Sequence, residues 1–438
     1  MPDAGGPEPG FEPPEPPGAT AGWLRVLRRS AIDLGPLRRH REFRLLTFSQ
    51  SLSFFGAMVG DVAVAYQVYA LTHSTVLVGL LGGVELLPLA VLGLAGGLLA
   101  DARDRRLMVL GSELAFVVMS AILLLNSVAG HPSVLLVFVV TAVRAGLFAV
   151  KRPSLEALMP RLVTPDEIPA ASAIGSIRSS VGAIGGPAAG GLLIALAGLP
   201  AAYGVDIAGF ALSLGLLTLM RATPPNPDAQ APSLRGLREG LAYAWSRPEL
   251  VGTYAVDIVA MLFGMPIALF PAIATRLGGP GILGLLYAAP SAGALLVTVA
   301  SGWTARVRRQ GLAVVYAAAA WGLAIIAFGF ASAPALALVL LGLAGAADAV
   351  SVIFRSSIWN QTIPDRLRGR LAGIELLSYT SGPALGSIES GVVAGLFGVQ
   401  ASIVSGGVLC VAGVAAMAGL LPRFRNYRRE PGSAPPAG

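Results

Sequence analysis

The chain has few of the residues on which several classes of protein depend. Its one cysteine, Cys410, excludes a disulfide framework. Its three histidines are isolated, so the clustered ligands of a metalloenzyme are missing and no metal site is expected. The only lysine, Lys151, lies in AVKRPS, which is not the GxxxxGK[ST] motif that binds nucleotide phosphates. ATP-driven transport by this chain is therefore excluded, and catalysis is not expected.

Charged residues are also scarce, at 13% of the chain, whereas about a quarter is usual in soluble proteins. Hydrophobic residues make up 55%, and the mean hydropathy is +0.72. These values indicate a membrane protein. The continuous Leu, Ala, Val and Gly runs predict helices rather than the alternating strands of a membrane barrel. We expect twelve spans, over residues 44–71, 76–99, 107–129, 133–150, 171–197, 202–220, 250–274, 281–303, 311–331, 334–354, 371–396 and 400–421.

Basic residues gather at alternate ends of these runs. Arginine clusters precede the first run, follow the second, eighth and tenth, and end the chain, while Lys151, Arg152 and Arg161 follow the fourth. Because basic residues near spans stay on the cytoplasmic side, both termini are predicted to be cytoplasmic, and the membrane is expected to be the inner membrane of a bacterium. Only the loop near Arg276 departs from this pattern. The net charge of +7 therefore reports topology, and no nucleic-acid partner is expected.

The sequence also repeats itself weakly at an offset of about 200 residues, as many secondary transporters do. GGLLADARDRR after the second run corresponds to SGWTARVRR after the eighth, and GPAAGG corresponds to GPALGS. The predicted domains are a disordered Pro-rich tail (1–42), a six-helix bundle (43–220), a cytoplasmic linker with an amphipathic helix (221–249), a second six-helix bundle (250–421) and a basic tail (422–438).

GGLLADARDRR resembles the signature loop between helices two and three of the major facilitator superfamily, although Asp104 stands where glycine is common. A branch of that superfamily resembling macrolide and enterobactin exporters often has DRR at this point. The matching residues are Gly97, Leu99, Asp101, Arg103, Arg105 and Arg106. The resemblance covers residues 40–421 and implies an all-α membrane protein with twelve transmembrane helices in two pseudo-symmetric six-helix bundles.

The same resemblance implies that this loop is a cytoplasmic latch. Asp101 would dock against the positive N-terminus of the eleventh helix, near Arg370, and the arginines would reach carboxylates. The alternative is a solvated loop whose charges only set topology.

The fifth run contains VGAIGGPAAGG, in which Gly182, Gly186, Pro187, Gly190 and Gly191 are predicted to place small residues on one face of a bent helix. This segment resembles the fifth-helix signature of drug-exporting proton antiporters in the superfamily, which implies export. Generic close packing, with no bearing on direction, is the alternative.

Ionisable residues inside the apolar runs are candidates for function, because a charge in hydrocarbon needs a partner or a cavity. Arg144 resembles a fourth-helix motif linked to proton coupling, although Leu147 and Phe148 replace its usual Gln and Gly. Asp61 and Glu85 are expected to face the same half of a central cavity. A carboxylate beside a cation can exchange a proton near neutral pH, which is what coupling requires.

The second half offers Asp257 and Asp348 as carboxylates, with Arg355 as one partner. Structural ion pairs between helices are the alternative for all of these residues. That alternative is favoured for Arg178, Asp206 and Glu375, which are predicted to lie near helix ends. Aromatic candidates for a pocket are Tyr66, Tyr69, Tyr254, Phe263, Phe270, Tyr287, Trp359 and Tyr379.

Together these features predict a secondary transporter that exports a small amphipathic molecule, drug-like or siderophore-like, in exchange for protons by rocking of its two halves. An importer and a lysophospholipid flippase of the same fold are the alternatives, and an intramembrane hydrolase or a transport-inactive receptor are alternatives of other classes. The expected partners are the substrate and the lipid bilayer. We expect a monomer without an obligate protein partner or a cofactor, driven by the proton gradient.

Overall fold

A computed structural model describes residues 33–102, 105–221, 239 and 242–429. These residues form helices and no strand. Ten of the helices are long and apolar enough to cross a membrane. The predicted all-helical membrane fold is thus confirmed, while the count of twelve spans stays a prediction.

The first bundle begins with the short helix α2 and ends with α7, which consists of two helical arms on either side of Gly198. Its elements are α2 (Gly35–Arg39), α3 (Arg41–Thr72), α4 (Thr75–Ala102), α5 (Arg105–Val128), α6 (Val134–Leu158), η1 (Met159–Arg161), η2 (Pro165–Glu167) and α7 (Ile168–Thr218).

The second bundle begins at α9 and ends in a short helix after the last apolar run. Its elements are α9 (Pro248–Gly264), η3 (Ile267–Leu269), α10 (Phe270–Leu277), α11 (Pro280–Val299), η4 (Ser301–Arg306), α12 (Gln310–Phe328), α13 (Pro334–Thr362), α14 (Asp365–Phe397), α15 (Val399–Leu420) and α16 (Pro422–Arg425). Most of the predicted linker, 221–249, lies outside the described residues.

Two boundaries differ from the prediction in ways that matter for the site. Helix α7 contains both the fifth and the sixth predicted runs, joined at Gly198, whose φ of 79° is readily adopted only by glycine. Helix α6 continues to Leu158, well past residue 150, so Lys151 and Arg152 belong to the helix and not to a loop. The apolar run ended at the first charge, whereas the helix continued because that charge is buried and paired.

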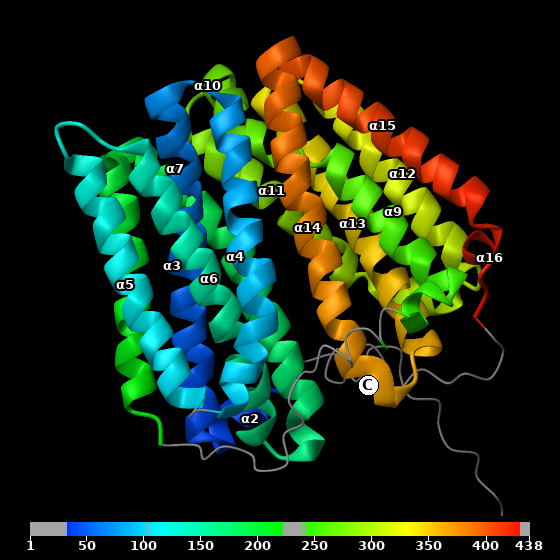
Figure 1. Cartoon of the computed structure of the whole chain (residues 1–438), viewed down its shortest axis with the longest axis horizontal. Coiled ribbons are helices and arrows are strands. Elements are labelled where there is room, and N and C mark those ends of the chain that lie inside the picture. Colours follow the sequence, from blue (N-terminus) through cyan, green and yellow to red (C-terminus); the bar gives the residue numbers. More distant parts are fainter. Residues whose placement is uncertain (1–32, 103–104, 222–238, 240–241, 430–438) are drawn as a thin grey trace, which may run out of the picture.

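The two bundles stand side by side, close together where α10 lies and diverging toward the end where α2 lies (Figure 1). We call the end with α2, η1, η2 and α16 the basic side. The bundles pack through α4 against α14 and through α7 against α11. Both contacts lie toward the α10 end, because Thr75 at the start of α4 donates to the carbonyl of Gly391 at 3.1 Å, and Gly191 meets the start of α11.

The glycines of the fifth run face two neighbours, not the single face predicted. A Cβ on Gly182 or Gly186 would collide with Phe54 or Met58 of α3, and one on Gly190 would make a tight contact with Val59 at 3.1 Å. A Cβ on Gly191 would lie 2.5 Å from the backbone nitrogen of Gly284, in the other bundle. Close helix approach therefore requires glycine on both sides of α7.

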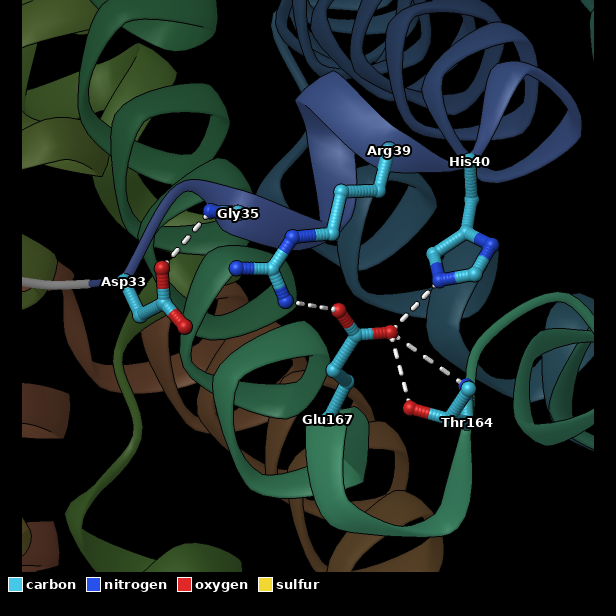
Figure 2. Close-up of polar contacts among 6 residues, drawn as sticks. All are labelled: Asp33, Gly35, Arg39, His40, Thr164 and Glu167. Carbon is cyan, nitrogen blue, oxygen red and sulfur yellow. Dashed lines mark hydrogen bonds and ion pairs between the residues drawn. The ribbon is translucent and has the colours of Figure 1, made fainter.

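Part of the N-terminal segment predicted to be disordered is helical and held in place. Glu167 accepts hydrogen bonds from Arg39 at 2.9 Å and from the Thr164 hydroxyl at 2.9 Å, and it pairs with His40 Nε2 at 2.5 Å (Figure 2). Contact with His40, followed by those with Thr164 and Arg39, lowers the pKa of Glu167 to about 2. This carboxylate, which is largely buried just before α7 begins, holds α2 against the bundle.

Candidate functional site

The charged residues of the first bundle converge on Arg144, in the middle of α6. Its Nη1 donates to Asp206 of α7 at 2.7 Å and to the Ser120 hydroxyl of α5 at 3.1 Å. Ser120 in turn donates to the same oxygen of Asp206 at 2.8 Å. Asp61 of α3 faces Arg144 from another direction, with Nη2 and Oδ1 3.7 Å apart. Four helices thus contribute to one cluster.

The two carboxylates of this cluster differ in accessibility. The side chain of Asp206 is fully buried, whereas that of Asp61 is 60% exposed. The neighbours of Asp61 on α3, Val59 and Val62, are buried. Asp61 therefore opens onto an accessible space beside a buried arginine, while Asp206 is a fixed counter-ion.

Local sequence explains the close approach of these helices. A Cβ on Gly60 would lie 2.5 Å from Oδ2 of Asp206 and 3.2 Å from Arg144, so any side chain there would displace the ion pair. On the other side, Phe116 and Phe210 stack with centroids 4.7 Å apart. Both rings lie within 6 Å of the Arg144 guanidinium and contribute cation–π attraction.

One further residue of the first bundle and one of the second lie close to Asp61. Glu85 of α4 is exposed, and its charge acts on that of Asp61. Tyr287 of α11 is close enough to interact electrostatically with both carboxylates. Its ring packs edge-on against Phe270 at 5.1 Å. Asp61, Glu85 and Tyr287 therefore border one site between the two bundles.

The second bundle holds a corresponding cluster around Arg355 of α13. Arg355 forms an ion pair with Asp257 of α9, and its Nη2 lies 3.7 Å from Asp348 of the same helix. Asp257 is buried, while the Asp348 side chain is 34% exposed. Each half thus combines one buried arginine, one buried carboxylate and one accessible carboxylate.

A second polar cluster of the first bundle was missed from the sequence. Lys151, predicted to lie in a loop, forms an ion pair with Glu113 of α5 at 2.6 Å and donates to the Ser53 hydroxyl at 3.0 Å. Gln50 donates to the same oxygen of Glu113 at 3.2 Å.

A spacing of seven residues in three helices could have revealed this cluster. It relates Glu113 to Ser120, Arg144 to Lys151 and Asp206 to Ser213. Asp206 was predicted to lie near a helix end and to form a structural ion pair. It lies well inside the second arm of α7, after Gly198, and it pairs with Arg144.

The predicted latch falls only partly on described residues. Gly97, Leu99 and Asp101 belong to α4, but their side chains, like that of Arg370, lie outside the described part, and so does Arg103. Arg105 is buried at the start of α5. Arg106 donates to the carbonyl oxygens of Leu217 and Thr218 at 3.3 and 2.8 Å, which satisfies the end of α7. This part of the loop therefore fastens α5 to α7 within one bundle.

Other aromatic candidates make structural contacts. Trp359 donates to the Thr253 hydroxyl at 2.7 Å and packs on Tyr254. The Arg152 guanidinium of α6 lies over the ring of Tyr379 of α14 at 5.5 Å, a contact between the two halves. In the described part of the chain, no group of three or more His, Cys, Asp or Glu side chains could hold a metal ion.

Comparison with known proteins agrees with this architecture. The model of the transmembrane secretion effector family matches residues 31–434. Curated relatives named enterobactin exporter, from Shigella boydii and Citrobacter koseri, are each 29% identical over 407 and 403 residues, covering 91% of this chain and 96% of each relative.

Solved transporters share the fold at low identity. One is a POT family transporter in complex with 5-aminolevulinic acid, with a TM-score of 0.70 and 12% identity over 88% of this chain and 97% of that one. Another is a bacterial homologue of the lysosomal transporter Spinster in an inward-facing conformation, with a TM-score of 0.68 and 16% identity over 89% of this chain and 98% of that one. These relatives and neighbours are transporters, not enzymes. The chain therefore belongs to the transmembrane secretion effector family and is a multi-pass membrane transporter of the major facilitator type.

Proposed function

We propose that the protein exports a small amphipathic molecule, of the catecholate siderophore or drug-like class, in exchange for protons. The observation that carries this proposal is Asp61, an accessible carboxylate held 3.7 Å from a buried arginine whose other carboxylate is sealed from solvent. A proton can compete with Arg144 for Asp61, and an acceptor group of the substrate can compete with Asp61 for Arg144. Neither change disturbs Asp206.

The chemistry of the site suits an aromatic, hydroxyl-bearing substrate. Arg144 can donate hydrogen bonds, Asp61 and Glu85 can accept them, and Tyr287 offers a ring from the opposite bundle. Catechol rings combine hydroxyl groups with an aromatic face, and the relatives named enterobactin exporters favour this class.

The arrangement of the bundles supports rocking. The close contacts at Gly191 with Gly284 and at Thr75 with Gly391 lie toward the α10 end, while the bundles diverge on the basic side (Figure 1). With the basic side cytoplasmic, as predicted, these close contacts lie at the outer end of the bundles, and rocking about them would alter the separation of the cytoplasmic ends. Both termini then lie in the cytoplasm of a bacterium, and a monomer driven by the proton gradient needs no cofactor.

Proteoliposomes test this function directly. We expect a pH gradient to drive accumulation of iron-free enterobactin or a lipophilic drug, and Asp61→Asn, Glu85→Gln or Arg144→Ala to abolish it. Glu156→Gln is the matched control, because Glu156 is an exposed carboxylate of the same bundle and, among the described residues, forms an ion pair with Arg152 one helical turn earlier.

Unchanged transport in all three site variants would contradict the proposed coupling. Accumulation in the direction of proton flow would instead establish an importer. Absence of any compound-dependent flux, with lipid movement between leaflets in its place, would establish a flippase.

A further inference from the structure

The cluster at Glu113 lies on the basic side of the Arg144 cluster. From Arg144 to Lys151 is two turns of α6, about 10 Å along the axis, in the direction of the basic side. The same spacing separates Ser120 from Glu113 on α5. A residue seven positions away lies on nearly the same helical face, so the two clusters stack in one column. The Phe116 ring touches both cations, with its centroid 5.6 Å from Lys151 Nζ and 5.9 Å from the Arg144 guanidinium.

The contacts of Glu113 leave one oxygen unused. Oε1 accepts from Lys151 and Gln50, whereas Oε2 is buried without a hydrogen-bond partner in the described part of the chain. The Glu113 side chain is fully buried and that of Lys151 is 8% exposed. A buried acceptor without a donor is unfavourable, and a proton placed on it would relieve that cost.

The surroundings of Glu113 are otherwise neutral or cationic. Gln50 and Ser53 of α3 are uncharged, and Lys151 of α6 is its ion-pair partner. Beyond it, Arg178 of α7 is close enough to repel Lys151 electrostatically. Within the described chain no other carboxylate contacts the pair, so protonation changes its charge from zero to plus one.

The second bundle joins the corresponding two helices differently. Helices α12 and α13 occupy the places of α5 and α6, and there Gln310 donates to the Ser357 hydroxyl at 3.0 Å and Gln361 donates to the side-chain oxygen of Gln310 at 3.3 Å. These neutral contacts lie at the first residue of α12, whereas Glu113 lies well inside α5.

We propose that Glu113, with Lys151 as its counter-ion, is a second proton-binding site, placed between the Arg144 cluster and the cytoplasm. It takes up the proton on Oε2, where an O–H bond forms, and releases it to cytoplasmic water when the bundles rock and Lys151 becomes more exposed. This inference rests on the proposed proton exchange and extends it from the accessible site to an inner one.

Infrared spectroscopy tests proton binding without a substrate. Difference spectra of the full-length protein in detergent, recorded across a pH titration, should contain a protonated-carboxyl signal that Glu113→Gln lacks and that the matched control Glu156→Gln retains. A signal unchanged in Glu113→Gln would overturn the proposal.

Transport separates this role from a structural one. Glu113→Gln in proteoliposomes should exchange labelled enterobactin at equal concentrations on both sides but lose accumulation driven by a pH gradient. Lys151→Met combined with Glu113→Gln leaves no unpaired charge and serves if the single variant does not fold. Restored accumulation in that double variant would show a purely structural pair and overturn the proposal. If the unmodified protein shows no pH-driven accumulation, the proposed antiport is wrong, while the infrared signal still decides whether Glu113 binds a proton.

Discussion

The two bundles use the same charges in different places. In the first, the carboxylate on helix α3, Asp61, is exposed, and the buried partner of Arg144 comes from α7. In the second, the carboxylate on α9, the counterpart of α3, is Asp257, which is buried against Arg355. Each bundle therefore buries an arginine against one carboxylate and leaves a second carboxylate accessible, but the two bundles place these groups on different helices. The α3 carboxylate is exposed in the first bundle, whereas the α9 carboxylate is buried in the second.

The largest effects are expected from removing either arginine. Arg144→Ala leaves Asp206 buried without its cation, and Arg355→Ala does the same to Asp257, so each should destabilise the fold by about 3–5 kcal/mol. Thermal unfolding in detergent measures this. Lys at either position is the charge-preserving control. A loss below about 1 kcal/mol in one bundle only would show that its cluster is not buried as described.

Neutralising the carboxylate on α9 and the one on α3 should have different effects on stability and transport. Asp257→Asn weakens a buried ion pair and should lower stability by about 1–3 kcal/mol. Asp61→Asn acts on an exposed side chain and should change stability by less than about 0.5 kcal/mol while abolishing pH-driven transport. The same melts and proteoliposome assays apply. Equal destabilisation by both substitutions would remove the distinction drawn between the bundles.

A single added methyl group should strain the contact between α7 and α11, which joins the two bundles. In Gly191→Ala the new Cβ would meet the Gly284 nitrogen and the Pro280 carbonyl at 2.5 Å, both backbone, so a loss of about 1–3 kcal/mol is expected. Gly175→Ala on the same helix meets open space and should be neutral or slightly stabilising. The rate of cysteine crosslinking between the bundles at the α10 end should also fall in Gly191→Ala but not in Gly175→Ala.

The smallest effect is expected for the two short terminal helices, α2 and α16, which are held to their bundles by different interactions. Glu167 holds α2 by charge, and because its pKa is lowered to about 2 from an ordinary 4.5, this contribution is complete above pH 4.5 and is lost as the pH falls toward 2. The other tail is held by Phe424, which is fully buried, and by a backbone hydrogen bond from Gly311 to Tyr427.

Hydrogen exchange should therefore show α2, but not α16, loosening in acid. Glu167→Gln should loosen α2 at neutral pH. Equal protection of both tails at low pH would mean that α2 is held by packing rather than by charge.

Much of this architecture could be predicted, because a membrane span requires a long apolar run and arginine marks its ends. The ionisable residues flagged inside those runs, Asp61, Arg144 and Asp348 among them, come together in the two clusters. Hydropathy alone could not place Lys151 inside a helix, because two charged residues that follow an apolar run are also typical of a loop. Glu113 lies inside the predicted run 107–129, and its seven-residue spacing from Ser120 was the available signal for it.

The sequence also could not show which neighbouring helix each glycine of α7 contacts. Spacing shows that small residues recur, but which neighbour each one meets depends on how the bundles dock. Arg106 illustrates the same limit, because its acceptors at the end of α7 are carbonyl oxygens that carry no mark in the sequence.

Gly198 has a mechanical consequence. One residue with a positive φ replaces a whole loop, so the two arms of α7 form a hairpin with no slack at its tip. One arm carries Gly191, which bears on the opposite bundle, and the other carries Asp206, the buried counter-ion of Arg144. A movement at the contact between the bundles is therefore transmitted through Gly198 to the arm that carries Asp206. Lengthening that tip should uncouple the two even where every charge is kept.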